Sequence, residues 1–127
     1  MPLPPNLWLD AAALGAAAIL LIHVVQGGRD HHRPMQASPI PEPDKAVWSV
    51  LWHLTSALLG LMTASLWAAA RGRAELAFLP LGVALSFTAR FLTESLRRFG
   101  CPWALPQWTL FALLSALIGA GLHLPPR

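Results

Sequence analysis

The sequence predicts an all-α fold, an integral membrane antiparallel four-helix bundle of up-down-up-down order. Three observations support this prediction. Hydrophobic residues make up 55% of the 127 residues and charged residues only 12%, against about 25% charged residues in soluble domains. Long apolar runs alternate with short polar breaks. Seven of the nine lysines and arginines lie in those breaks, as expected where a membrane protein meets water.

Four apolar runs are long enough to cross a bilayer, which takes about 18–20 residues in a helix. Short polar segments separate them, at the Gly27-Gly28 pair, at 71–73 and at the sequence RRFGCP, 97–102. Helices joined by short links pack as antiparallel neighbours. We therefore expect residues 1–127 to form a single four-span transmembrane domain, with spans at about 7–26, 46–70, 74–95 and 103–124.

The first apolar run is interpreted as a membrane span and not as a cleavable signal peptide. A signal peptide places basic residues before its apolar core, whereas no basic residue precedes this run and Asp10 lies near its start. The sequence AAALGAAA presents small side chains. We expect this helix to approach its neighbours closely, as small residues allow in membranes.

The longest expected connection is the proline-rich loop at 27–45. It carries four prolines, at positions 34, 39, 41 and 43, and proline-rich segments favour extended backbone. We expect this loop to cross the mouth of the bundle, with His31 and His32 in water.

The basic residues predict the orientation in a bacterial inner membrane. The first and third connections hold five of them, and the two chain ends together with the second connection hold three. Basic residues accumulate on the cytoplasmic side, so we expect the first and third connections in the cytoplasm and both termini outside. The two sets are Arg29, Arg33, Lys45, Arg97 and Arg98, and Arg71, Arg73 and Arg127.

Every expected span contributes a polar side chain to the same half of the bundle. In antiparallel helices the ends of the first and third spans lie beside the starts of the second and fourth. At a rise of about 1.5 Å per residue, most of these side chains lie within roughly 10 Å of that face. We therefore predict a one-sided intramembrane polar pocket made of His23, Gln26, His53, Ser56, Arg90, Glu94 and Gln107.

Helical periodicity of about 100° per residue gives these side chains an expected direction. His53 shares a stripe with Ser56 and Gly60, and His23 shares one with Ala16. Polar groups in hydrocarbon are costly and turn toward each other. We therefore expect both histidines to face the interior of the bundle.

The third span carries a polar stripe of its own. Arg90 and Glu94 are four residues apart, a spacing at which helix side chains meet, and Ser86 and Arg97 continue the stripe. We expect Arg90 and Glu94 to interact. The alternative for every residue of the predicted pocket is a purely structural role, as an ion pair, an interfacial anchor or a hydrogen bond between helices.

Two cofactors are considered for the predicted pocket. A single metal ion could be ligated by His23, His53 and Glu94, since histidine–metal bonds are about 2 Å long. Haem fits the two histidines less well, because its axial ligands approach a flat macrocycle from opposite sides while adjacent helices lie only about 8–10 Å apart. No HxxxH motif is present.

Other function classes find no motif in the chain. G-x-S-x-G, HExxH and phosphate-cradling glycine loops are absent from the sequence. The single cysteine, Cys101, excludes an intramolecular disulfide. No basic and aromatic cluster indicates nucleic-acid binding. The expected partners are the lipid bilayer and other membrane subunits or a second copy.

The leading interpretation is a small integral membrane protein whose polar pocket serves binding, or an accessory role in a membrane complex. The alternative is a membrane-embedded enzyme that acts on a lipid, a quinone or another amphipathic substrate, with or without a metal ion.

Overall fold

The computed structural model describes residues 6–124, and every regular element in that range is helical. The predicted all-α class is confirmed for this part of the chain. Residues 1–5 and 125–127 lie outside the described residues, and they include Arg127, one of the basic residues used to predict the orientation. The elements are α1 (Leu7–Ile22), the π-helix η1 (His23–His32), α2 (Arg33–Ala37), α3 (Glu42–Ala70), the 3-10 helix η2 (Ala74–Ala77), α4 (Phe78–Phe99), the 3-10 helix η3 (Pro102–Ala104) and α5 (Gln107–His123).

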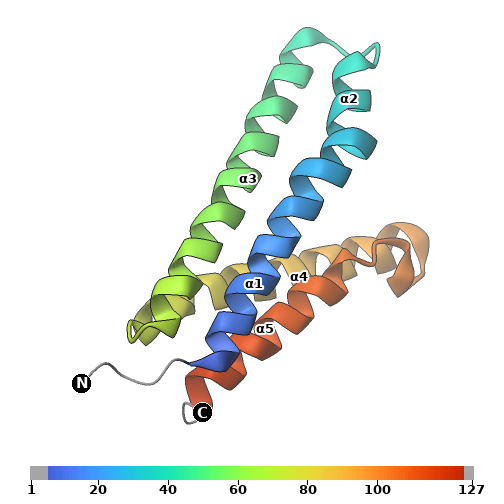
Figure 1. Cartoon of the computed structure of the whole chain (residues 1–127). Coiled ribbons are helices and arrows are strands. Elements are labelled where there is room, and N and C mark those ends of the chain that lie inside the picture. The colour runs from blue at the N-terminus through green and yellow to red at the C-terminus, as the bar shows by residue number, and fades with distance from the viewer. Residues whose placement is uncertain (1–5, 125–127) are drawn as a thin grey trace.

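The first helix does not end at the Gly27-Gly28 pair. α1, η1 and α2 form one continuous helical rod, Leu7–Ala37 (Figure 1). The predicted break is therefore wrong, and so is the extended loop at 27–45, because only residues 38–41 separate α2 from α3. A π-helix is closed by hydrogen bonds between residues i and i+5. Gly27 and Gly28 lie inside these wider turns, and the helix continues through them. Pro34 lies in the first turn of α2, where proline is tolerated.

Among residues 6–124, three helices are long and apolar enough to cross a membrane. They are Leu7–Ala37 with 31 residues, Glu42–Ala70 with 29 and Ala74–Phe99 with 26. The expected fourth span begins later than predicted, because 103–106 belong to η3 and a turn. The apolar helix that remains, Gln107–His123, has 17 residues. At about 1.5 Å per residue it is roughly 25 Å long, slightly less than a hydrocarbon core of about 30 Å.

The second break lies where it was predicted, at 71–73, whereas the third begins later than predicted, because α4 includes Arg97 and Arg98. α3 ends at Ala70 and α4 ends at Phe99. Gly72 and Gly100 follow with φ of 100° and 65°, values that glycine adopts without a steric cost. The Gly100 N–H donates to the Leu96 carbonyl at 2.9 Å, which satisfies one of the last carbonyls of α4.

The helices form two hairpins that diverge from one another. α1 with α2 lies beside α3, and α4 lies beside α5 (Figure 1). α1 also packs against α5, whereas α3 and α4 have few contacts. In Figure 1 the hairpins meet near the start of α1 and the end of α5, and they separate toward α2 and the α4–α5 connection. We call the first the converging end and the second the diverging end.

The buried core lies at the converging end. On α1 it consists of three alanines between Leu9 and Ile19, and on the partner helices it includes larger side chains that fill the space opposite the alanines. The glycine at 121 on α5 continues this close contact, since a Cβ there would lie 2.6 Å from Cγ of Leu9. The central buried residues are Ala12, Ala13 and Ala16 of α1, Leu59, Met62 and Leu66 of α3, and Phe111, Leu114 and Ile118 of α5.

Polar contacts at the start of α1 fasten the converging end. Asn6 caps α1 by accepting the Leu9 N–H at 3.3 Å, and its Nδ2 donates to the Gly121 carbonyl at 2.7 Å. Arg71 Nη1 donates to Asp10 Oδ1 at 3.2 Å. The start of α1 is thus bonded to the end of α5 and to the residue that follows α3.

Candidate functional site

A cleft of about 830 Å³ lies between the two hairpins on the side of the diverging end. Its volume falls within the range of about 300–1,000 Å³ that is typical of ligand pockets. Apolar residues, including Ile19, Leu59 and Phe111, line the part next to the core, and the polar residues lie toward α2 and the α4–α5 connection. The polar lining residues are His23, Gln26, His31, Trp48, Trp52, Thr55, Gln107 and Thr109.

One wall of the cleft is aromatic. The rings of Phe87 on α4 and Phe111 on α5 stack with their centroids 4.7 Å apart, and Phe91 lies 6.1 Å from each of them. All three side chains line the cleft. Aromatic pairs of this kind hold a definite geometry, so this wall is a firm apolar surface that needs no bound molecule to shape it.

The opposite wall carries a stack of an indole and two imidazoles. The ring centroids of Trp52 and His23 lie 4.0 Å apart, and those of Trp52 and His32 lie 5.0 Å apart, with 20° between the planes in each pair. Because His23 and His32 are two turns apart along η1, the indole is inserted between them. The stack fixes the side of Trp52 that faces the cleft.

The π-helix explains why nine residues separate two imidazoles that share one face. In an α-helix of 3.6 residues per turn, nine residues make two and a half turns and place the side chains on opposite faces. A π-helix has about 4.4 residues per turn, so nine residues make about two turns. η1 therefore brings His23 and His32 to the same side of the rod, facing α3.

A glycine in the turn between the histidines makes room for the indole. A Cβ on Gly27 would lie 2.8 Å from Cη2 of Trp52, whereas one on Gly28 would lie 4.0 Å from Cζ2. In the segment IHVVQGGRDHHR, His23, Gly27 and His32 are thus spaced so that the indole of Trp52 fits between them. The histidine one turn before the glycines is a stacking partner, and the glycines do not end the helix.

The cleft gathers three of the seven residues that the sequence assigned to a polar pocket. His23, Gln26 and Gln107 line it, from η1 and α5. Ser56 lies on the adjacent side of α3 and donates its hydroxyl to the Trp52 carbonyl at 3.0 Å. His53 is exposed and touches the cluster only edge-on, with its ring centroid 5.8 Å from that of His32.

The predicted interior stripe of α3 is wrong. His53 is exposed and Ser56 and Gly60 are only half-buried, and the inward residues repeat at alternating intervals of three and four along a neighbouring stripe. The physical reason is that side-chain size, and not polarity, decides which face of α3 meets α1. α1 contributes alanines to the contact, so the space opposite must be filled by large side chains. The inward residues of α3 are Trp48, Trp52, Thr55, Leu59, Met62, Leu66 and Ala69.

The polar stripe of α4 lies outside the cleft. Arg90 and Glu94 do interact, with Nη2 and Oε1 3.4 Å apart, but Glu94 makes a shorter contact of 2.6 Å with Arg98. The side chains of Arg90 and Arg98 are 74% and 70% exposed. The interaction is confirmed, whereas its expected burial in a polar pocket is wrong.

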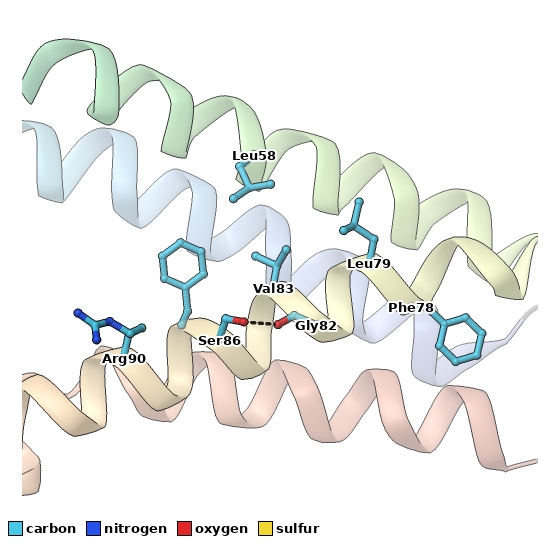
Figure 2. A pocket seen from close by; sticks show the side chains of 8 residues that line it. Leu58, Phe78, Leu79, Gly82, Val83, Ser86 and Arg90 are labelled. Carbon is cyan, nitrogen blue, oxygen red and sulfur yellow. Dashed lines mark hydrogen bonds between the residues drawn. The ribbon is translucent and has the colours of Figure 1, made fainter. Parts of the chain in front are cut away.

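Arg90 belongs to a second, shallower groove between α3 and α4. Figure 2 shows Arg90 at one end of this groove and Phe78 at the other, with Leu58 of α3 above Val83. The groove measures about 570 Å³. The Ser86 hydroxyl, which points along it, donates to the Gly82 carbonyl of its own helix at 2.8 Å.

The residues proposed as metal ligands do not gather in one place. His23 stacks on Trp52, His53 is exposed and Glu94 is bonded to two arginines. Among residues 6–124 no group of three or more His, Cys, Asp or Glu side chains is arranged to hold a metal ion.

Sequence reasoning missed the aromatic residues of the site. The predicted pocket includes none of Trp48, Trp52, Phe87, Phe91 and Phe111. The repeat of Trp48, Trp52, Thr55 and Leu59 at intervals of four, three and four is a signal that could have found the inward face of α3.

Comparisons of the chain with models of protein families, with curated proteins and with solved structures gave no match. The geometry of the cleft is therefore the ground for a functional conclusion.

Proposed function

We propose that this chain is an integral protein of the bacterial inner membrane that binds an amphipathic molecule in the cleft between its hairpins. Its four helices would cross the bilayer in up-down-up-down order, with the α2–α3 and α4–α5 connections in the cytoplasm. The lipid bilayer is then its first partner.

The outer faces of the helices support membrane insertion. Large apolar side chains are exposed on every long helix, a surface that water would penalise and lipid would not. Examples with exposures of more than half are Leu14 and Leu21 on α1, Leu54 and Leu61 on α3, Leu79 and Leu85 on α4, and Leu113 on α5. α5 is short for a span, and local thinning of the bilayer accommodates such a difference.

The polarity gradient along the cleft is the observation that carries the binding proposal. Its deep part is apolar and aromatic, with Phe87, Phe91 and Phe111, and its polar residues lie toward the diverging end. An amphipathic molecule would place its tail on the phenylalanines and its head beside His23 and Gln107. Sites of this kind, mostly apolar with a few polar groups, are the usual form of small-molecule pockets.

Binding is favoured over the two other functions considered. An enzyme of the acid–base type needs proton-transfer groups that face one substrate. Of the two histidines that line the cleft, His23 is stacked on Trp52 and His31 is exposed, and the described lining includes no Asp, Glu, Lys, Cys or Ser. An accessory role in a larger complex is compatible with binding, since the open groove between α3 and α4 leaves Phe78 and Leu79 exposed. A specific partner is not needed to explain the cleft.

A pair of matched variants on α5 tests the binding proposal. Leu110 lines the cleft and Leu113 faces outward, 61% exposed. Leu110→Trp should fill the cleft, while Leu113→Trp adds the same bulk on the outer face. The protein is purified in mild detergent and its retained small molecules are counted by native mass spectrometry. Wild type and Leu113→Trp should retain one amphipathic molecule per chain that Leu110→Trp loses. Equal retention by all three proteins would refute the cleft as the binding site.

A further inference from the structure

Three side chains that line the cleft, from three helical segments, each carry a buried polar atom without a hydrogen-bond partner among the described residues. These atoms are Nε2 of His23 on η1, Nε1 of Trp48 on α3 and Oε1 of Gln107 on α5. Burial of a polar atom without a partner is unfavourable, so three such side chains around one cleft indicate a site that is completed by a bound molecule.

The chemistry of these atoms specifies the group that completes the site. The indole N–H of Trp48 can only donate, the amide oxygen of Gln107 can only accept, and a neutral imidazole nitrogen can do either. The partner must therefore offer both an acceptor and a donor over a short distance. A hydroxyl group does both at a single oxygen, and a glycerol head or an alcohol supplies one or more hydroxyls.

The charge of the lining disfavours the common ionic headgroups. None of the described residues that line the cleft is Arg, Lys, Asp or Glu. Arg90 precedes Phe91 in the sequence, but its side chain lines the other groove. A phosphate or carboxylate head would meet no permanently charged side chain there, only the imidazoles of His23 and His31, and burial of an unpaired charge is strongly unfavourable. An uncharged head fits this lining better.

We propose that the cleft selects an uncharged, hydroxyl-bearing amphipath, with its hydroxyl between Trp48, Gln107 and His23 and its tail along Phe87, Phe91 and Phe111. This inference rests on the proposed binding function and adds the chemistry of the head. The same head chemistry occurs on acyl chains, as in monoacylglycerols, and on isoprenoid chains, as in long isoprenoid alcohols. The tail binds through apolar area alone, so the selection acts on the head.

A set of ligands that share one tail tests the selection. Monooleoylglycerol carries hydroxyls, methyl oleate has no donor, and oleate and oleoyl lysophosphatidic acid are charged. Titration of the delipidated protein in detergent by native mass spectrometry gives a dissociation constant for each. We expect monooleoylglycerol to bind at least about tenfold more tightly than the other three, a factor equal to about 1.4 kcal/mol. Geranylgeraniol, tested beside it, distinguishes an isoprenoid from an acyl source.

Isosteric variants test the assignment of the atoms. Trp48→Phe removes the indole N–H, and Gln107→Met removes the amide oxygen while keeping the length of the side chain. Each should weaken monooleoylglycerol binding about tenfold and leave methyl oleate binding unchanged. Because these atoms are unpaired in the free protein, neither variant should lower the melting temperature without ligand. Trp103→Phe is the control, since Trp103 is 64% exposed and does not line the cleft.

The outcomes separate this inference from the proposed function. Binding of all the oleoyl compounds with similar constants, or full affinity in both variants, would overturn the head assignment and leave the binding cleft in place. Binding of none of them, or a dimer in which a second copy occupies the cleft, would overturn both.

Discussion

Trp52 shows at the residue scale how the site is formed. Its indole is held between His23 and His32, and its edge lies against Gly27. Stacked aromatic pairs add about 0.5–1.5 kcal/mol beyond the buried area. Two such contacts fix Trp52 on the face of α3 that also carries Trp48. The indole N–H of Trp48, which we propose donates to the ligand, thus lies one helical turn from the immobilised side chain of Trp52.

Adding a methyl group at Gly27 should loosen this stack. A Cβ at Gly27 would lie 2.8 Å from Cη2 of Trp52, and the indole cannot move aside because an imidazole lies on each of its faces. We expect Gly27→Ala to lower the free energy of unfolding by about 1–3 kcal/mol, as overpacked sites do. Thermal unfolding in detergent, followed by near-ultraviolet circular dichroism, measures the change.

Gly28→Ala is the matched control for this substitution. Its Cβ would meet the nearest atom of Trp52 at 4.0 Å, an ordinary contact distance, and alanine favours helix over glycine by up to about 1 kcal/mol. We expect wild-type or slightly higher stability. If the two variants have the same melting temperature, Trp52 is not confined by Gly27.

His23 and His53, both expected to face the interior, differ in where the structure places them. Ala12 and Ala16 are fully buried and His23 lies on the same helix, facing the cleft. His53 differs because α3 meets the alanine face of α1 with its large side chains, which turns His53 outward. Which of two adjacent stripes on a helix faces inward depends on the partner helix, and a single-sequence pattern does not contain that information.

At the scale of elements, the π-helix and the short α5 are the features that periodicity could not predict. A glycine pair before two histidines is a usual sign of a helix end, and here it lies within a π-helical stretch of ten residues, His23–His32. Gly72 and Gly100 differ from this pair, because each adopts a positive φ at the end of a helix. Gly27 and Gly28 have no such angle, so composition alone was misleading.

The contact between α1 and α5 depends on a single missing side chain. At Gly121 a Cβ would lie 2.6 Å from Cγ of Leu9 and 3.2 Å from its backbone nitrogen, whereas at Gly119 it would meet nothing within 4 Å. We expect Gly121→Ala to destabilise the protein by about 1–3 kcal/mol through overpacking, and Gly119→Ala to be neutral or slightly stabilising.

Thermal unfolding of both variants in the same detergent checks this difference. The cleft should survive in Gly119→Ala, so this variant should retain as much bound amphipath as wild type. An equal loss of stability in both would mean that helix propensity and lipid exposure, and not the contact with Leu9, determine the result at these glycines.

At the scale of the whole molecule, the two hairpins diverge so that one end is packed and the other is open. The buried core lies at the converging end, and the cleft lies toward the diverging end. The sequence predicted polar residues in that half of the molecule, and three of the seven line the cleft. It did not predict the divergence, because the packing of one hairpin on the other depends on the shape of α1, which touches both α3 and α5.

The fixed converging end leads to a prediction about topology. Asn6 Nδ2 donates to the Gly121 carbonyl at 2.7 Å, so the end of α5 lies beside the start of α1. If α1 crosses the membrane, the end of α5 must be on the same side as the start of α1 and as the α3–α4 connection. A helix of 17 residues must then cross the bilayer, although it is shorter than the other spans.

Cysteine labelling with a membrane-impermeant maleimide tests this topology in spheroplasts and in inverted vesicles. The reporters are the native, exposed Cys101 in the α4–α5 connection, and Ala37→Cys, Ala74→Cys and His123→Cys in a Cys101→Ser background, all at exposed positions. We expect positions 37 and 101 to react in inverted vesicles, on the cytoplasmic side, and positions 74 and 123 to react in spheroplasts. Reaction of position 123 together with position 101 would show that α5 does not cross. The contact between Asn6 and Gly121 could then not form in the membrane, and the cleft, which needs α5 as one wall, would be lost with it.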